Sequence, residues 1–413
     1  MPPNHRRVTG LSGNEVYCLN KLGLRAGQLC VGNSVVAIGL AGGLGAGLST
    51  LGGGEVTQIT QLVHSGRMNA FNRMMDEAKT YGGAGVTGVS FDMINHGGNL
   101  EFITIGSTIH APEGSPDAMQ FSTAADAQEL YCQLDAEFQP LHFVFGNVAY
   151  SIGLGNSVAG AFTQLARGEV AQYTQIFDTT RHLALTRIMD GARQYGANAV
   201  IGIQTTITSL LGAQEMMMVG TASKHAGYGA SDQIATSDMT NEEMWNMINL
   251  GYLPLRLVMG VSVYSLGLKG GILSSLQSLG GGEVQGLTEL LYEAREKALA
   301  RIEQDADRFG ADEVIGVKTR VYDLGGGLVE FLAIGTAVKK IAGVKTKSDT
   351  LPPQAIIQDR ETFVDSFTTT NVGSGARKES ARRTQGGPIS IVIFLFFIVF
   401  YLFRIFSLSH ILH

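Results

Sequence analysis

The sequence predicts an α+β protein of three tandem βαββ units. Each unit is expected to be an antiparallel sheet with one long helix and a short preceding helix, and a C-terminal transmembrane helix follows. Three observations support this. One pattern recurs every 114 residues, so that Glu55 returns as Glu169 and Glu283. Each copy combines a long apolar helical stripe with pieces rich in β-branched residues, and the last segment of the chain is apolar and almost free of charge. A fixed period indicates one folding unit used three times, so chemistry that belongs to the unit must appear in every copy.

The expected boundaries follow the positions where the repeated pattern fades. In order along the chain they are a first unit at 13–111, a second at 127–225, a third at 241–341, a flexible tether at 345–387 and a transmembrane segment at 388–412. The segments between the units contain Pro, Gly, Ser and Asp, which are typical of loops. One insertion late in the third copy moves its closing glycine to Gly335, from Gly106 and Gly220 in the other copies.

The first half of a unit is clearest in the third copy. Residues 251–268 contain short β-rich pieces that predict a strand. Apolar residues then follow at i, i+4 and i+7, as Ile272, Leu276 and Leu279, and all equivalent positions in the other two copies are apolar. This spacing predicts a short helix with one buried stripe.

The second half predicts a long helix and a hairpin. Apolar residues recur with a period near 3.6 from Leu287 to Phe309, and Gly310 ends the helix in the position of a C-cap glycine. A strand begins at Val314, and glycines at 325–327 turn the chain into a second strand at 329–338. The predicted three-stranded sheet has two edges and an uncovered face, so such units tend to associate.

The composition limits the classes of partner. Charged residues make up 16% of the chain, against about 25% in soluble domains, which suggests that much of each unit's surface is covered. The net charge of −6, with no basic domain, argues against nucleic acid as a partner. Cys18, Cys30 and Cys132 lie far apart in the sequence, so they predict buried thiols in a reducing compartment rather than a disulfide framework.

The C-terminal segment predicts a tail anchor. Residues 389–403 carry no charge but cover only about 22 Å of a roughly 30 Å hydrocarbon core. Extension to Leu412 supplies the length and includes Arg404, whose side chain snorkels toward headgroups. Basic residues lie upstream, so the preceding units are expected in the cytoplasm of a single-pass membrane protein. The alternative is an apolar helix that docks onto protein.

Motifs in the third copy resemble a known family. They are Glu-Ala-Arg-Glu at 293–296, Gly-Ala-Asp at 310–312 and Gly-Thr-Ala-Val at 335–338. This combination is similar to the small YbjQ-like proteins, which are described as heavy-metal-binding. The three copies together cover about 290 residues, and the first copy departs most from the pattern. The resemblance implies a dodecin-like βαββ fold and ring-shaped oligomers, typically pentamers, and it implies no established reaction.

The family description suggests a metal, and the three copies provide an internal check. His64 aligns with Asp178 and Tyr292, and His182 aligns with Met68 and Glu296, so no histidine is common to the copies. The sequence therefore predicts no metal site shared by the units and no cofactor. A site in one copy or between chains stays open. The glycine run at 43–47 is not followed by Gly-Lys-Ser/Thr, so it does not predict a nucleotide site.

All three copies retain one glutamate and two arginines in addition to their apolar pattern. The candidate contacts between units are Glu55, Glu169, Glu283, Arg67, Arg181, Arg295, Arg73, Arg187 and Arg301. The glutamate precedes the long helix, where a carboxylate caps the positive end of the helix dipole. The arginines are expected in ion pairs between units. The alternative is catalytic, with the glutamate as base and an arginine as anion clamp.

These observations favour a non-enzymatic, membrane-tethered, homo-oligomeric scaffold. It would form a ring or larger shell on the cytosolic face of a membrane, with further copies of itself and the bilayer, through Ile389 to Leu412, as partners. The alternative is a sensor at the membrane that binds a metal or small ligand between subunits. An enzyme that uses the retained glutamate and arginines is the least favoured hypothesis.

Overall fold

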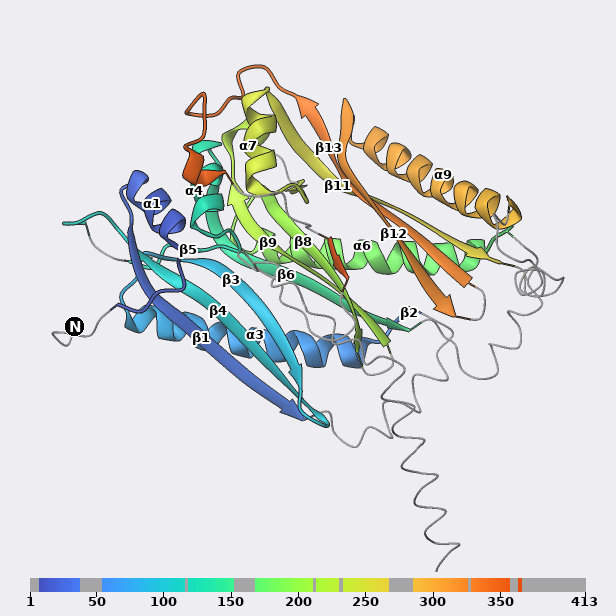
Figure 1. Cartoon of the computed structure of the whole chain (residues 1–413), viewed down its shortest axis with the longest axis horizontal. Coiled ribbons are helices and arrows are strands. Elements are labelled where there is room, and N and C mark those ends of the chain that lie inside the picture. Colours follow the sequence, from blue (N-terminus) through green and yellow to red (C-terminus); the bar gives the residue numbers. More distant parts are fainter. Residues whose placement is uncertain are drawn as a thin grey trace, which may run out of the picture. The chain divides into compact units, whose positions relative to one another are not determined.

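The computed structural model describes residues 7–37, 54–115, 118–151, 168–210, 213–229, 233–266, 285–325, 328–356 and 363–365. All of them belong to the first of two compact parts of the chain, residues 1–375. The chain has a mixed α+β fold of repeated units, as the sequence predicts. Each unit contains a three-stranded antiparallel sheet and one long helix (Figure 1).

The helices and strands repeat in the same order in each unit. The first unit contains α1 (Gly13–Lys21), β1 (Arg25–Ala37), β2 (Gly54–Glu55), α3 (Thr57–Thr80), β3 (Gly85–Asn95) and β4 (Asn99–His110). The second contains β5 (Phe121–Ser122), α4 (Ala127–Asp135), β6 (Gln139–Ser151), β7 (Gly168–Glu169), α6 (Ala171–Arg193), β8 (Ala199–Leu210) and β9 (Ala213–Lys224). The third follows η1 (Ala226–Tyr228) and β10 (Ala235–Thr236), and contains α7 (Asn241–Asn249), β11 (Tyr252–Ser265), α9 (Gln285–Arg308), β12 (Glu313–Gly325) and β13 (Leu328–Lys340), with η2 (Pro353–Ala355) and β14 (Phe363–Asp365) after it.

The second strand of each hairpin lies at the centre of its sheet. The orders are β1-β4-β3-β5, β10-β8-β9-β6-β2 and β12-β13-β11-β7, with β14 paired to β8. Two segments expected as loops between units carry the short strands β5 and β10, which add in parallel to β3 and β8. The segments before the helices, β2 and β7, leave their own unit and pair with the first strand of the next one.

The long helices and the hairpins agree with the sequence prediction. The helix expected at 287–309 is α9, and Gly82, Gly196 and Gly310 follow the three helices with φ of +71°, +67° and +62°. A residue with a Cβ is strained at such angles, so glycine ends each helix here.

A second set of glycines brings each first strand against its helix. A Cβ on Gly32, Gly146 or Gly260 would lie 2.0, 2.4 or 1.9 Å from a helix carbonyl oxygen. These oxygens belong to alanines at the same position of each repeat, Ala70, Ala184 and Ala298. The strand therefore crosses the helix at backbone contact distance, which only glycine permits.

The short helices differ from the prediction. The apolar stripe at 272–279 and its equivalents, like the glycine run at 43–47, lie outside the described residues. The described short helices, α1, α4 and α7, instead begin each unit. Each starts with a capping box, formed by Ser12 and Glu15 in α1 and by equivalent pairs in α4 and α7. The Ser/Thr/Asp-x-x-Glu spacing is a known helix-start signal, which the sequence analysis did not use.

Residues 347 and 348, at the start of the expected flexible tether, bond to the second unit. Ser348 Oγ donates to Asp135 Oδ1 at 2.8 Å, and the backbone N–H of Lys347 donates to the Asp135 carbonyl at 2.9 Å. The Asp135 carboxylate also accepts the indole N–H of Trp245 at 2.7 Å. This buried acceptor places the segment after the third unit against α4.

The predicted membrane segment at 388–412 lies outside the described residues. None of the helices in the described ranges combines the length and the apolar character needed to cross a bilayer.

The core is built in layers that join the units. Phe71 and Met74 of α3 pack both on β3 of their own sheet and on Phe143 and Phe145 of the next sheet. In the same way Ile188 of α6 lies in a cluster that includes β6, β11 and β13. Each of these helices is therefore buried between its own sheet and the sheet of the next unit. Helix α9 forms its apolar cluster with the third sheet, and its polar side chains Lys297, Arg301 and Asp305 contact β7 and α6 of the second unit (Figure 1).

Candidate assembly interface

A buried ion pair joins the first and second units. Arg67, in the middle of α3, bonds Glu215 of β9 through both terminal nitrogens, and the Nη2–Oε2 distance is 2.8 Å. The two side chains are 2% and 1% exposed. The side-chain amide of Asn147 donates to Glu215 Oε1 at 3.1 Å and to the Thr60 carbonyl at 3.2 Å. A bidentate arginine–carboxylate pair fixes the relative orientation of the two elements that carry it.

The same pair joins the second and third units. Arg181 of α6 donates to Glu330 of β13 from Nε at 3.2 Å and from Nη2 at 3.0 and 2.8 Å, and both side chains are fully buried. The guanidinium lies over the ring of Tyr150, 4.6 Å from its centroid. Burial disfavours the charge of Arg181, but the Glu330 carboxylate outweighs this and raises the pKa of Arg181 above its ordinary value. Burial raises the pKa of Glu330 as well, and the charge and hydrogen bonds of Arg181 oppose this rise.

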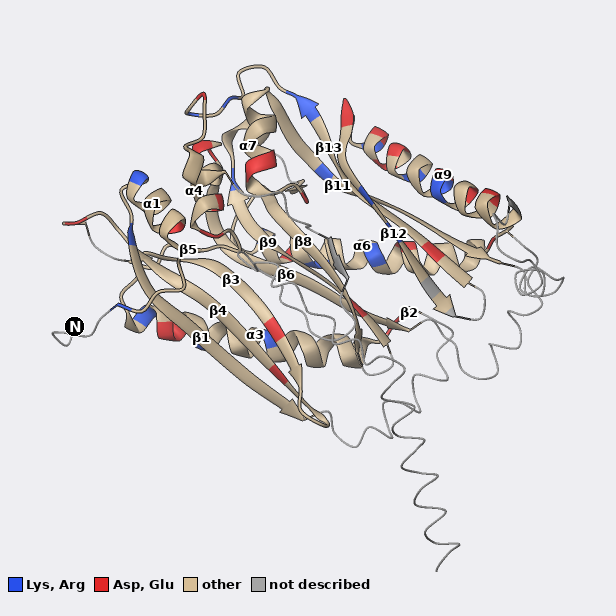
Figure 2. Cartoon of the chain, viewed as in Figure 1, with Lys and Arg blue, Asp and Glu red and all other residues tan. Residues whose placement is uncertain are grey.

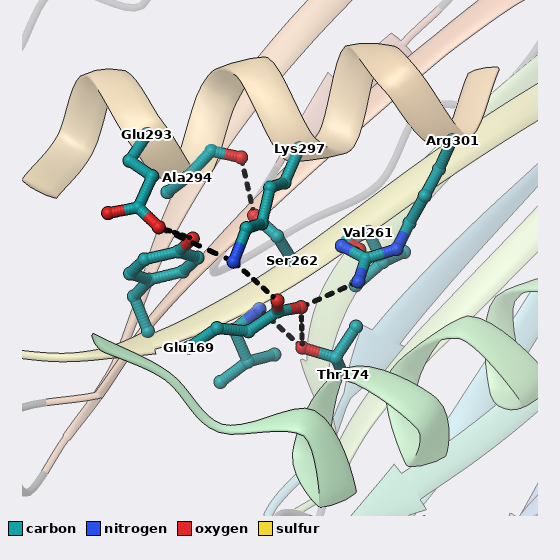
Figure 3. A network of polar contacts seen from close by, with 10 residues as sticks. Glu169, Thr174, Val261, Ser262, Glu293, Ala294, Lys297 and Arg301 are labelled. Atoms are coloured by element: carbon teal, nitrogen blue, oxygen red, sulfur yellow. Dashed lines mark hydrogen bonds and ion pairs between the residues drawn. The ribbon is translucent and has the colours of Figure 1, made fainter. Parts of the chain in front are cut away.

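The glutamates before α3 and α6 contact the next unit, as Figure 3 shows for Glu169. Glu169 accepts hydrogen bonds from Arg301 Nη2 at 2.6 Å, from Lys297 Nζ at 3.1 Å and from Thr174 Oγ1 at 3.1 Å. Burial alone would raise the pKa of Glu169, but the bonds from Arg301 and Lys297 lower it below its ordinary value. Glu55 makes the equivalent contact with Arg187 at 2.8 Å.

Backbone hydrogen bonds repeat beside these side chains. The N–H of Ala149 donates to Thr60 Oγ1 at 2.9 Å, and the N–H of Val263 donates to Thr174 Oγ1 at the same distance. Next to them, β2 pairs with β6 and β7 pairs with β11. The interface between successive units therefore contains the same ion pairs, hydroxyl bond and added strand each time.

Not all predicted residues make such contacts. Arg295 bonds Glu296 on its own helix at 3.1 Å and is 45% exposed. Arg73 donates to the carbonyl of Asn33 in its own unit. Glu283 lies outside the described residues.

Among the described residues, the expected capping by the glutamate is not observed at α3 or α6. The N-caps of α3 and α6 are Val56 and Val170, and neither has a side-chain cap hydrogen bond. The β2 and β7 strands direct the preceding chain to the neighbouring sheet, so the carboxylates of Glu55 and Glu169 bind arginines there instead.

The carboxylates that bind the first arginine of each helix do not recur at the 114-residue spacing in all three copies. Glu215 and Glu330 share the register of Glu101: each is the cross-strand neighbour of the equivalent residue on the first strand, which is Val35, Ala149 or Val263. The inserted residue in the third hairpin shifts this spacing from 114 to 115 residues. A comparison at constant spacing therefore aligns Glu215 with a valine and hides the repeat.

Comparison with known proteins identifies the repeated unit. A family model described as "Putative heavy-metal-binding" matches residues 24–109, 136–226 and 252–341, which is more than half of the chain. The chain belongs to the YbjQ family. Two YbjQ-family relatives are UPF0145 proteins: one of Thermoplasma acidophilum is 36% identical over 99 residues, and one of Thermotoga maritima is 44% identical over 85 residues. These matches cover 22% and 20% of this chain and 83% and 80% of the relatives.

A longer relative is an encapsulin nanocompartment protein of Mycobacterium tuberculosis. It is 29% identical over 234 residues, which cover 54% of this chain and 87% of that protein. The match is longer than two copies of the repeat spacing, so it includes at least one junction between YbjQ units.

The described residues do not fit the metal site that the YbjQ family description implies. Within the described ranges, no three His, Cys, Asp or Glu side chains converge as a metal ion would need. Burial raises the pKa of Cys18 to about 11 and that of Cys30 to about 12, so these thiols remain protonated. Burial also lowers the pKa of His64, whose Nδ1 lies 3.1 Å from the Asn147 amide oxygen.

Proposed function

We propose that this protein is a non-enzymatic scaffold that assembles with further copies of itself into a ring or larger shell. The observation that carries the proposal is the repeated junction between units. This junction is formed twice within the chain, each time between the helix side of one unit and the outer sheet face of the next. The outer sheet face of the first unit and the helix side of the third unit have no such partner within the described parts of the three units.

One half is the outer face of the first sheet. Val35 is 59% exposed, whereas its equivalents Ala149 and Val263 are fully buried under the preceding helix. Val31 is 44% exposed, and its equivalents Phe145 and Met259 are 8% and 1% exposed. An apolar sheet face of this kind favours association because its burial removes apolar surface from water.

The other half is the helix side of the third unit. Val317 and Val321 of β12 are exposed, whereas the equivalent Ile203 and Ile207 of β8 are buried against the next unit. Tyr292 of α9 is also exposed. The third unit therefore has the surface that the first two units use for contact, without a following unit to cover it.

The comparisons support a role in assembly. The Mycobacterium tuberculosis relative is named as an encapsulin nanocompartment protein, and its match covers more than half of this chain. The residues that a catalytic hypothesis would use as base and anion clamp, Glu169 and Arg301, are bonded to each other, which favours a structural role.

Membrane attachment through residues 389–412 is part of the proposal. The apolar composition of this segment motivates it, and several anchored tails per assembly would increase avidity for a bilayer.

The test is the oligomeric state of the full-length protein. In a mild detergent that keeps the apolar C-terminal segment in solution, mass photometry and electron microscopy should show discrete closed or extended assemblies. A chain that remains monomeric at micromolar concentration would refute the scaffold role.

A further inference from the structure

We infer that the third unit of one chain docks on the outer sheet face of the first unit of a second chain, with Arg295 against Glu101. This inference rests on the proposed scaffold function and specifies its partner, contact and direction. The occupant is a second copy of this chain because the contact would continue, residue for residue, an interface that the chain already forms twice.

The ion pair defines the register. Inside the chain, the arginine of each helix bonds a glutamate of the following unit, as Arg67 does with Glu215 and Arg181 with Glu330. Arg295 is the third arginine of this series and has no following unit. Glu101 is the first glutamate and has no preceding unit; in the described chain it bonds His96 at 2.7 Å. The two ends thus carry the two halves of one bidentate pair.

A hydroxyl bond has the same register. Thr60 and Thr174 are buried where they accept the N–H of Ala149 and Val263. The equivalent Thr288 of α9 is exposed. Its partner position on the first sheet is Val35, which is cross-strand to Glu101. In addition, β1 is an edge strand of its sheet, whereas β6 and β11 are each extended by a strand from the preceding unit.

The contact is directional. One half is a sheet face and the other is a helix with an adjacent strand, so neither half is complementary to itself. Contacts of this type join head to tail, and they produce a closed ring or an open filament rather than a symmetric dimer.

Helix α9 carries more charge along its length than α3 and α6 (Figure 2). Glu289, Glu293 and Glu296 are exposed on it beside Arg295. Charged side chains of this kind favour contact of the exposed helix face with water. It also makes the contact between chains weaker and more salt-sensitive than the two contacts within the chain.

Charge reversal tests the pair in the full-length protein. Arg295→Glu or Glu101→Arg alone should weaken association between chains at least about 30-fold, because each places like charges in a buried site. The double variant exchanges the charges and should recover most of the association. The Arg295 side chain is 45% exposed, and the Glu101 side chain is 20% exposed and pairs with His96 at the surface, so near-native Trp245 fluorescence serves as the folding control.

Cross-linking tests the register independently. Under mild oxidation, Thr288→Cys combined with Val35→Cys should yield disulfide-linked multimers on a non-reducing gel. The matched control, Thr174→Cys with Val263→Cys, occupies the equivalent positions within one chain and should form an internal disulfide without a change in mass. The native cysteines Cys18, Cys30 and Cys132 are buried and do not interfere.

The outcomes separate the inference from the scaffold function. Assembly that persists in both single charge variants, with no intermolecular disulfide although the control pair links, overturns the docking site but leaves self-assembly intact. A disulfide between residues 288 and 35 of the same chain overturns it in favour of closure within one chain. Protection of Val35→Cys from a thiol reagent in dilute monomer overturns it in favour of a segment of the same chain. If the full-length protein does not assemble at all, both the docking site and the scaffold function are refuted.

Discussion

Replacement of Glu330 by glutamine should destabilise the junction between the second and third units by about 3 kcal/mol. The change removes one negative charge with almost no change in shape. It leaves Arg181, which is fully buried, without the carboxylate that accepts three hydrogen bonds at 2.8 to 3.2 Å. Removal of one partner of a buried ion pair costs roughly 3–5 kcal/mol, and the amide oxygen retains part of the hydrogen bonding, so the lower end of this range is expected.

Urea unfolding followed by the fluorescence of Trp245 measures this effect. Trp245 is the single tryptophan of the chain, is buried in α7, and donates to Asp135 of the second unit, so its emission reports the contact between these units. A loss of about 3 kcal/mol lowers the urea midpoint by roughly 1 to 3 M for ordinary values of the denaturant slope.

Glu101→Gln is the matched control, because Glu101 occupies the same register in the first sheet and is paired at the surface. In dilute, monomeric protein it should leave the midpoint unchanged. Equal midpoints for the two variants would refute the view that burial of the repeated pair, rather than its sequence position, determines its contribution.

Three further predictions follow, two from the structure and one from the composition of the C-terminal segment. His182 contacts Asp305 across the second junction; burial alone would lower the pKa of His182, but the hydrogen bond to Asp305 and the charge of Asp178 raise it. The contribution of His182 to the free energy of unfolding is therefore present below pH ~6.5 and is lost as pH rises through the raised pKa. Wild-type protein should lose stability relative to His182→Gln between pH 6 and pH 9, and parallel stability curves for the two proteins would contradict this. Gly260→Ala should lower the thermal midpoint strongly, because the added Cβ would lie 1.9 Å from a carbonyl oxygen of α9. The control Gly191→Ala should not, because the nearest atom to its added Cβ lies at 3.8 Å. Comparable midpoints of the two variants in differential scanning fluorimetry would contradict the close contact between β11 and α9. Deletion of residues 388–412 should release the protein from liposomes in a flotation assay, and continued flotation would argue against the tail anchor.

The sequence by itself determined the local and repeated features. The 3.6-residue period located the long helices, and the glycines at their ends identified where each helix stops, because these signals depend on residues close together in the chain. The three-fold repeat also selected Glu55, Glu169, Arg187 and Arg301, since a contact that belongs to the repeated unit requires the same residue in each copy. The capping boxes of the short helices were equally local and could have been recognised.

Only the tertiary structure decided the partners. Arg67 and Glu215 are 148 residues apart, and their meeting depends on which face of the second sheet is placed against α3. Asp135 bonds residues 347 and 348 because the fold places these distant segments side by side. The polar composition of the segment around residue 347 does not predict this contact. The arginine at this position of the long helix is buried in the first two units, as Arg67 and Arg181. In the third unit the equivalent residue, Arg295, is exposed. Burial depends on whether a following unit is present, and this is why identical positions in the repeat differ in energy and in the role proposed for them.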